Sequence, residues 1–376
     1  MTYDITQRTL HFREPAGTSR GTYTERRVWY VTLHEAGHSG TGECAPLPRL
    51  SCDDIPNYET VLNEFCQQVC QTGHLTADIL PYPSMRFGLE CALTMLYRQS
   101  HILFDTPFTQ GKTGMPINGL IWMGTYEEMH RRLTEKIRAG FHCIKVKIGA
   151  IGWDKDMELL RQCASLLKLG HGDAEETTLR VDANGAFAPE EAPQRLEELA
   201  RLGIHSIEQP IRQGQWTEMA RLCRTSPLPI ALDEELIGIN DTEGKIRLLD
   251  TLRPQYIILK PSLHGGLSGC NEWIQLAEER GIGWWATSAL ESNVGLSAIS
   301  QWVAQYSPSM AQGLGTGLLY TDNTPAETEV RGEEIFYRVT QVSHVMEVKG
   351  IKGVMRIKEV KEVKGVKEVK DDTFSL

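Results

Sequence analysis

The chain has 376 residues, of which 41% are hydrophobic and 23% charged, with a net charge of −10 at pH 7. This length suits a barrel of roughly 250 residues together with a second domain. The acidic balance argues against a nucleic-acid partner, and the longest apolar stretches fall far short of the roughly 20 residues of a membrane span. The first residues have neither a basic region nor an apolar core, so we expect no signal peptide, no membrane partner and a cytoplasmic protein.

Residues 1 to about 115 predict an α+β arrangement. Strand-like alternation covers 9–12 and 27–35, and helical periodicity covers 58–72 and 84–99. The stretch 37–48 is predicted to be mostly loop. This part of the chain has no strand–helix–strand pattern at a fixed interval, so we do not expect it to belong to a barrel.

From residue 116 short apolar segments alternate with amphipathic ones. The apolar segments predict strands at 117–123, 143–148, 179–182, 206–208, 230–233, 256–260 and 283–287. The segments between them predict helices, among them 126–139, 154–167, 189–202 and 269–279. Buried strands that alternate with helices indicate a parallel sheet. Seven such units, with a short eighth strand near 313–319, predict an α/β fold with a closed barrel.

The end of the chain, 346–376, has a different composition. Valine or isoleucine recurs every three residues from 348 to 369, usually followed by lysine, and the segment 347–370 carries eight Lys/Arg and four Glu. A period of three matches neither an α-helix nor a strand. We therefore interpret it as a low-complexity basic tail, and the interspersed glutamates disfavour a membrane-binding role.

Polar side chains occur at the ends of successive predicted strands, where the active sites of parallel barrels lie. They are Lys145, Lys147, Asp182, Asn184, Glu208, Asp233, Lys260, Ser288, Glu291 and Ser292. Asp182, Glu208, Asp233 and Lys260 follow one another at intervals of 26, 25 and 27 residues, each about one strand–helix unit. Each motif alone is more typical of a turn or a solvated edge, but together they predict side chains at one level of the barrel mouth.

Three carboxylates at one mouth would repel each other without a cation. Asp182, Glu208 and Asp233 offer three oxygen ligands and leave positions for water and substrate. This arrangement suits Mg²⁺, with Mn²⁺ able to substitute, whereas Zn²⁺ is disfavoured because no His or Cys joins the set. A metal on a substrate carboxylate stabilises the enediolate that forms when the α-proton leaves.

The lysines supply the base that such a reaction needs. Lys145 and Lys147 are two residues apart on one strand, so their side chains share a face, and we expect each to lower the pKa of the other. Lys260 comes from a strand across the barrel and approaches the opposite face of the substrate. The prediction is a proton abstraction next to a carboxylate.

These motifs resemble those of the enolase superfamily, in its muconate-lactonising-enzyme-like subgroup, over essentially residues 1–345. The subgroup's Lys-X-Lys, its three carboxylate ligands and its opposing lysine all have a match here. The resemblance implies a (β/α)₇β TIM-type barrel over 116–309, and an α+β capping domain of 1–115 to which 310–345 returns. It also implies that cap loops around 18–23 and 47–53 close the site and set its specificity.

Within this subgroup the stretches 18–23, 42–48, 117–119 and 288–292 are most similar to the o-succinylbenzoate synthases. That family dehydrates 2-succinyl-6-hydroxy-2,4-cyclohexadiene-1-carboxylate to 2-succinylbenzoate in menaquinone biosynthesis. The resemblance implies a carbon–oxygen lyase in which Lys147 removes the α-proton and Lys260 stabilises the metal-bound enediolate. The substrate-binding residues that it implies are Lys145, Asn184, Ser288, Glu291 and Ser292.

An N-acylamino acid racemase or dipeptide epimerase on the same scaffold is the alternative. There Lys147 and Lys260 would exchange protons on the two faces of the substrate, after the same first step. The stretch Gly313-Leu-Gly-Thr316 lacks the Asp of the Gly-Leu-Asp-Thr found in relatives, which weakens this alternative because epimerases bind the substrate ammonium group in this region. A small-molecule carboxylate is the expected partner, and homo-oligomerisation stays open.

Overall fold

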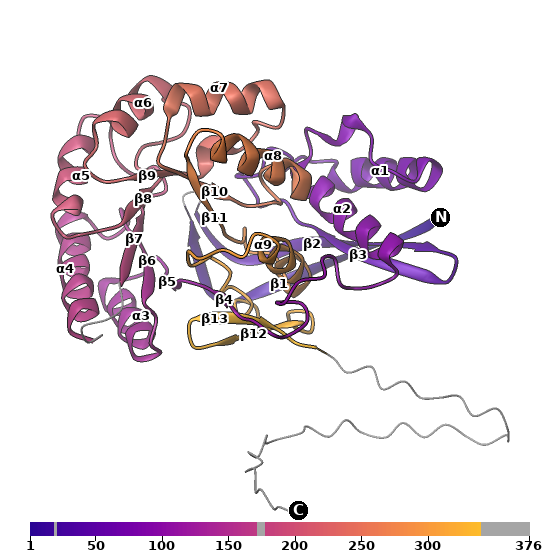
Figure 1. The fold of residues 1–376 in the computed structure, drawn as a ribbon, viewed down its shortest axis with the longest axis horizontal. Coiled ribbons are helices and arrows are strands. Elements are labelled where there is room, and N and C mark those ends of the chain that lie inside the picture. Colours follow the sequence, from indigo (N-terminus) through magenta and orange to yellow (C-terminus); the bar gives the residue numbers. More distant parts are fainter. Residues whose placement is uncertain (19–20, 171–176, 340–376) are drawn as a thin grey trace, which may run out of the picture. The chain divides into compact units, whose positions relative to one another are not determined.

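The computed structural model describes residues 1–18, 21–170 and 177–339. The predicted tail 346–376 lies outside these residues. The first part of the described chain forms an antiparallel sheet of β1 (Thr2–Thr18), β2 (Gly21–Glu35) and β3 (His38–Cys44), in the order β1-β2-β3. Helices α1 (Tyr58–Thr72) and α2 (Pro83–Arg98), with the short turn η1 (Ala77–Ile79), accompany this sheet (Figure 1).

Strand β3 occupies a segment that we predicted to be mostly loop, and that prediction was wrong. Its glycines suggest a loop, yet they are required because α2 packs directly on the strand. A Cβ atom on Gly40 would lie 2.1 Å from the carbonyl oxygen of Ala92, and one on Gly42 would lie 1.8 Å from that of Gly88. Close backbone approach, rather than a turn, explains these glycines.

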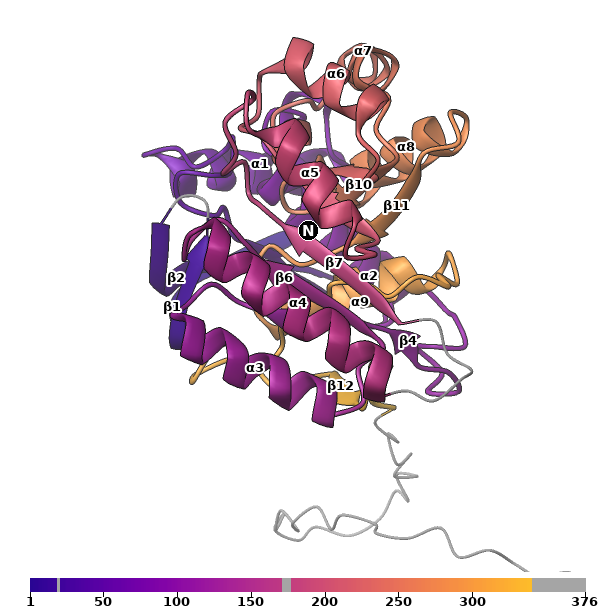
Figure 2. The ribbon, with the colours of Figure 1, turned by 90° about the vertical axis from the view of Figure 1, so that its left-hand side faces the viewer.

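In the described part of the chain, seven parallel strands form one sheet in the order β11-β10-β9-β8-β7-β6-β5. The strands are β5 (Gly119–Ile121), β6 (Cys143–Lys147), β7 (Thr178–Asp182), β8 (Ser206–Glu208), β9 (Ile230–Leu232), β10 (Tyr256–Leu259) and β11 (Gly283–Ala286). The helices that follow them are α3 (Tyr126–Arg138), α4 (Trp153–Gly170), α5 (Ala192–Ala200), α6 (Trp216–Thr225), α7 (Thr242–Leu252), α8 (Gly266–Glu278) and α9 (Asn293–Ala304), with the turn η2 (Glu234–Leu236) after β9. Figure 2 shows α3, α4 and α5 in sequence order along the outside of β6 and β7.

Residues 312–313 close the barrel between its first and last strands. Ile117 forms a parallel bridge with Gln312, and Thr287 forms one with Gly313. The backbone N–H of Gln312 donates to the carbonyl oxygen of Pro116 (2.8 Å), and that of Gly313 donates to Ala286 (2.8 Å). The α/β barrel fold that we predicted is confirmed, with an eighth strand shorter and slightly earlier than expected.

The chain then returns to both ends of its first part. Leu319 and Thr321 exchange backbone hydrogen bonds with Arg13 and His11 of β1. Strands β12 (Thr328–Arg331) and β13 (Glu334–Tyr337) form a small antiparallel sheet with β4 (Met115–Pro116). We retain as a proposal the division into a cap of 1–115 with 310–345 and a barrel of 116–309. Among the helices of the described residues, none has the length and apolar character to cross a membrane.

Candidate active site

The registers of the barrel strands bring the predicted charged residues to one level. Lys147 pairs in register with Asp182, and Asp182 with Glu208, across β6, β7 and β8. Asp233 and Lys260 directly follow β9 and β10. Ile144, Val146 and Ile148 alternate with the two lysines and are in the hydrophobic core, so Lys145 and Lys147 face the other side of the strand, toward the barrel interior.

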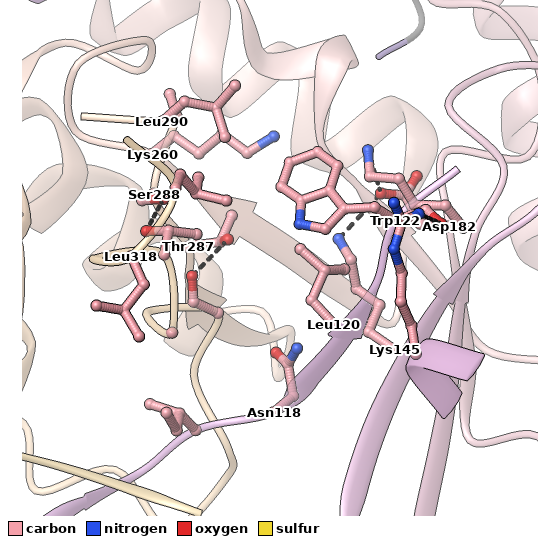
Figure 3. A pocket seen from close by; sticks show the side chains of 18 of the residues that line it. Asn118, Leu120, Trp122, Lys145, Asp182, Lys260, Thr287, Ser288, Leu290 and Leu318 are labelled. Carbon is pink, nitrogen blue, oxygen red and sulfur yellow. Dashed lines mark hydrogen bonds and ion pairs between the residues drawn. The ribbon is translucent and has the colours of Figure 1, made fainter. Parts of the chain in front are cut away.

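A pocket of about 300 Å³ opens above these residues. Its wall contains six of the predicted site residues: Lys145, Lys147, Asp182, Asn184, Lys260 and Ser288. Glu208 and Asp233 lie beneath them, where Glu208 bonds Lys145 and Asp233 bonds Lys260. In Figure 3, Lys145 and Asp182 lie on one side of the pocket and Lys260 lies on the other.

The lysines and carboxylates form a buried network of opposite charges. The Nζ atom of Lys145 lies 2.9 Å from Oδ2 of Asp182 and 2.7 Å from Oε2 of Glu208. Lys147 Nζ lies 3.5 Å from Oδ2 of Asp182 and donates to Oδ1 of Asn184 at 2.9 Å. Because a buried charge is costly without a partner, this pairing is what allows three lysines and three carboxylates to share the barrel interior.

The network shifts the pKa values of its members in opposite directions. Burial and the charge of Asp182 raise the pKa of Glu208 to about 8. Burial opposes ionisation of Asp182, but Lys145 and Lys147 outweigh it and hold the pKa of Asp182 below its usual range. We expected Lys145 and Lys147 to lower each other's pKa; instead, although burial opposes it, Asp182 and Glu208 raise the pKa of Lys145. The neighbouring carboxylates dominate because they lie within hydrogen-bonding distance.

The donor set suits a hard divalent cation. Asp182, Glu208 and Asp233 are 1%, 2% and 1% exposed, and all their donors are carboxylate oxygens. Oε1 of Glu208 and Oδ1 of Asp233 are buried and accept no hydrogen bond from any described residue. Across the described ranges no three acidic, His or Cys side chains converge closely enough, as they stand, to enclose an ion, because lysine ammonium groups occupy the positions between the carboxylates.

Several pocket residues had no role assigned to them from the sequence, namely Trp122, Glu234 and Thr316. Trp122 follows β5, and its ring centroid lies 5.3 Å from Lys147 Nζ. Glu234 accepts a hydrogen bond from Nδ2 of Asn184 at 3.0 Å and lines the pocket. Ser288 Oγ and Thr316 Oγ1 are hydrogen-bonded at 2.7 Å. Position alone could have identified Trp122, since it lies at the carboxyl end of a barrel strand like the predicted residues.

The apolar part of the wall comes partly from the predicted cap loops. Leu47 and Leu50, from the loop expected at 47–53, line the pocket with Leu290 and Leu318. In the loop expected at 18–23, the hydroxyl of Tyr23 donates to the carbonyl oxygen of Pro48 at 2.6 Å. Tyr23 therefore contacts the 47–53 loop.

Two predicted substrate-binding residues lie behind the wall instead of in it. Glu291 and Ser292 are fully buried, and neither is among the described residues that line the pocket. Glu291 accepts hydrogen bonds from Ser262 and from the backbone N–H of Ala289. Ser292 caps α9 by accepting at its Oγ from the N–H of Val294. Their contacts position the segment that carries Ser288.

Two family models match the chain. The model described as enolase C-terminal domain-like matches residues 128–343, and the one described as MenC, N-terminal domain matches 18–96. Together they cover most of the described residues and both halves of the site.

Four matches, from three organisms, illustrate the similarity. The o-succinylbenzoate synthase of Desulfotalea psychrophila is 45% identical over 86% of this chain and 95% of the relative. The crystal structure of MenC from the same organism matches with a TM-score of 0.74 and 41% identity, over 89% of this chain and 99% of that one. The L-Ala-D/L-Glu epimerase of Escherichia coli is 30% identical over 70% of this chain and 77% of its own length. The o-succinylbenzoate synthase of Thermosynechococcus elongatus, solved with Mg in the active site, shares the fold at 24% identity and a TM-score of 0.65, over 83% of this chain and 92% of that one.

Proposed function

The chain belongs to the o-succinylbenzoate synthase family of the enolase superfamily, and from this premise we propose that it dehydrates 2-succinyl-6-hydroxy-2,4-cyclohexadiene-1-carboxylate to 2-succinylbenzoate in menaquinone biosynthesis. The observation that carries the proposal is the placement of lysines on two sides of one pocket. Lys260 lies across the pocket from Lys145 and Asp182 (Figure 3), and Lys147 Nζ lies 3.5 Å from Oδ2 of Asp182. A cytoplasmic location and a small-molecule carboxylate partner belong to the same proposal.

In this proposal Asp182, Glu208 and Asp233 hold a divalent cation, Mg²⁺ with Mn²⁺ able to substitute. The cation supplies positive charge to the substrate carboxylate as the α-proton leaves. The Mg in the active site of the Thermosynechococcus elongatus relative supports this assignment.

The lysines carry the proton transfer. Lys147 takes the α-proton at its Nζ, and Lys260 faces the charge that develops on the opposite side. Lys147 then returns its proton to the departing hydroxyl group, so that one C–H and one C–O bond break, water leaves and the ring becomes aromatic. Lys145 and Asn184 orient the substrate and Lys147, since each contacts a group of this network.

The chain differs from the epimerase alternative at the end of the barrel. Gly315 lines the pocket, and a Cβ atom there would meet no atom closer than the 3.4 Å contact with Ile117. The pocket thus has room at this position but no carboxylate to bind an ammonium group, as an epimerase would require.

The test is turnover of the cyclohexadiene carboxylate with Mg²⁺, monitored by loss of diene absorbance. Lys147→Ala and Lys260→Ala are each expected to lower kcat by about 10²- to 10⁴-fold, the usual contribution of a positioned acid or base. Lys155→Ala, at an exposed position of α4, is the matched control and should retain wild-type activity. Deuterium exchange into dipeptides by an enzyme that does not dehydrate the diene would contradict the proposal.

A further inference from the structure

A strained turn forms part of the pocket wall between β11 and α9. Leu290 has a φ of 64°, in the left-handed region that costs a non-glycine residue roughly 1–2 kcal/mol. Its side chain lines the pocket, on the same side as Lys260 in Figure 3, and is 5% exposed. Strain of this kind persists where surrounding contacts determine the conformation, which is common at functional sites.

Buried side chains hold the polar backbone groups of this turn. The N–H of Ala289 donates to Oε2 of Glu291 at 2.7 Å, and its carbonyl oxygen accepts from the guanidinium of Arg26. The hydroxyl of Tyr320 donates to the carbonyl oxygen of Leu290 at 2.6 Å. Arg26 comes from β2, so the first part of the chain already fixes one side of the turn.

Glu43 of β3 fixes the other side. Its carboxylate accepts from the N–H of Ser292 at 2.9 Å, from Oγ of Ser292 at 2.6 Å and from the N–H of Gly295 at 2.8 Å. These amides belong to the first turn of α9, where a carboxylate is stabilised by unsatisfied N–H groups and the helix dipole. Glu43 is 1% exposed, so water cannot replace these bonds without disrupting the packing.

We infer that Glu43 is a positioning residue for substrate binding: from β3 it anchors the start of α9 and thereby holds the strained turn that presents Leu290 and Ser288 to the pocket. The inference deepens the proposed function and rests on it for the identity of the substrate. Among the described residues, the side-chain hydrogen-bond partners of Glu43 are Ser292 and Gly295. Neither lines the pocket, and neither is a reacting lysine. Its loss should therefore weaken substrate binding while leaving the proton-transfer groups in place.

The chain contains a matched control for this role. Glu90 of α2 accepts from the N–H of Leu267 at 2.6 Å and from the N–H of Ser268 at 3.3 Å, at the start of α8. It is thus a second carboxylate that caps a barrel helix from far away in the sequence. Neither Glu90 nor its side-chain partners Arg86, Leu267 and Ser268 are among the described pocket-lining residues. Replacing Glu90 therefore removes a carboxylate from the start of a barrel helix while leaving the turn at 288–292 unchanged.

The experiment compares Glu43→Ala, Glu43→Gln and Glu90→Ala in the full chain with Mg²⁺. For Glu43→Ala we expect KM to rise about 10-fold with kcat changed less than about 3-fold, because a wall contact is lost without loss of the reacting groups. Glu43→Gln keeps one carbonyl acceptor and should restore an intermediate KM. Glu90→Ala should lower the unfolding temperature and leave KM within about 2-fold of wild type.

Hydrogen exchange provides a readout that does not depend on turnover. Glu43→Ala should speed amide exchange in peptides spanning 288–296, whereas Glu90→Ala should speed it at 266–270 only. Unchanged KM and unchanged exchange at 288–296 in folded Glu43→Ala would overturn the inference. If wild type fails to dehydrate the diene, the proposed function is contradicted, and faster exchange at 288–296 would still show that Glu43 holds the turn.

Discussion

At the scale of single residues, the left-handed backbone of Leu290 shapes the pocket wall, and no local sequence motif predicts it. Left-handed backbone is usually signalled by glycine, asparagine or aspartate, and the stretch Ser288–Ser292 contains none of them. The conformation is imposed by partners remote in sequence, Arg26, Glu43 and Tyr320. The sequence therefore singled out this segment but named Glu291 and Ser292, which lie behind the pocket wall, and not Leu290, which lines it.

The strain at Leu290 can be measured with two truncations. Leu290→Ala removes the buried side chain and keeps the strain, whereas Leu290→Gly removes both. We expect Leu290→Gly to be more stable than Leu290→Ala by about 1 kcal/mol, the reverse of the usual order, because only glycine tolerates a positive φ without cost. Urea unfolding of both variants gives the difference, and an alanine variant as stable as the glycine one would contradict the strain.

At the scale of elements, helix α2 depends on a carboxylate outside it. Its N-cap residue, Tyr82, forms no side-chain cap, and Asp53 accepts instead from the N–H of Ser84 (2.8 Å) and from its hydroxyl (2.6 Å). Asp53 lies in the loop that brings Leu47 and Leu50 to the pocket. Burial raises the pKa of Asp53 to about 6, although the bonds from Ser84 oppose it.

This shift predicts a pH-dependent stability. A carboxyl group whose pKa is raised on folding contributes stability that is fully present below its unfolded pKa, about 4, and is lost as the pH rises through about 6. Asp53→Asn keeps a carbonyl acceptor and cannot ionise. Its free energy of unfolding, relative to wild type, should therefore increase by up to about 3 kcal/mol between pH 4 and pH 7.

Urea unfolding at several pH values measures this difference. Asp78→Asn, at an exposed position of η1, is the control and should run parallel to wild type. A constant offset between Asp53→Asn and wild type over the whole range would show that Asp53 does not titrate on unfolding.

The elements themselves were predictable to different degrees. Helix α1 was predicted at its observed bounds, and β8 likewise, because amphipathic period and a buried apolar run are local signals. Strand β3 was missed because its glycines serve packing against α2, a contact that no local pattern encodes. The cap of α2 by Asp53 was invisible for the same reason, since its partner is 31 residues away.

At the scale of the whole molecule, the barrel converts a regular sequence spacing into a shared level in space. Intervals of 26 and 25 residues predicted that Asp182, Glu208 and Asp233 occupy one level of the barrel, and the strand registers align the first two. The spacing could not predict how the negative charges of these carboxylates are balanced. The ammonium groups of Lys145 and Lys260 pair with them, as a bound cation would, and this pairing depends on side-chain conformations that residue intervals do not encode.

That balance predicts how a metal should affect the stability of the molecule. A cation that binds the folded carboxylates but not the unfolded chain stabilises by about 2.7 kcal/mol at a hundred times its dissociation constant. Mg²⁺ should therefore raise the unfolding temperature by several degrees, and EDTA should reverse the increase. Asp182→Asn removes one ligand and should abolish the increment, whereas Asp154→Asn, at an exposed position of α4, should keep it. Differential scanning fluorimetry across a Mg²⁺ titration distinguishes the two, and an equal increment in both variants would place the cation elsewhere than on these three carboxylates.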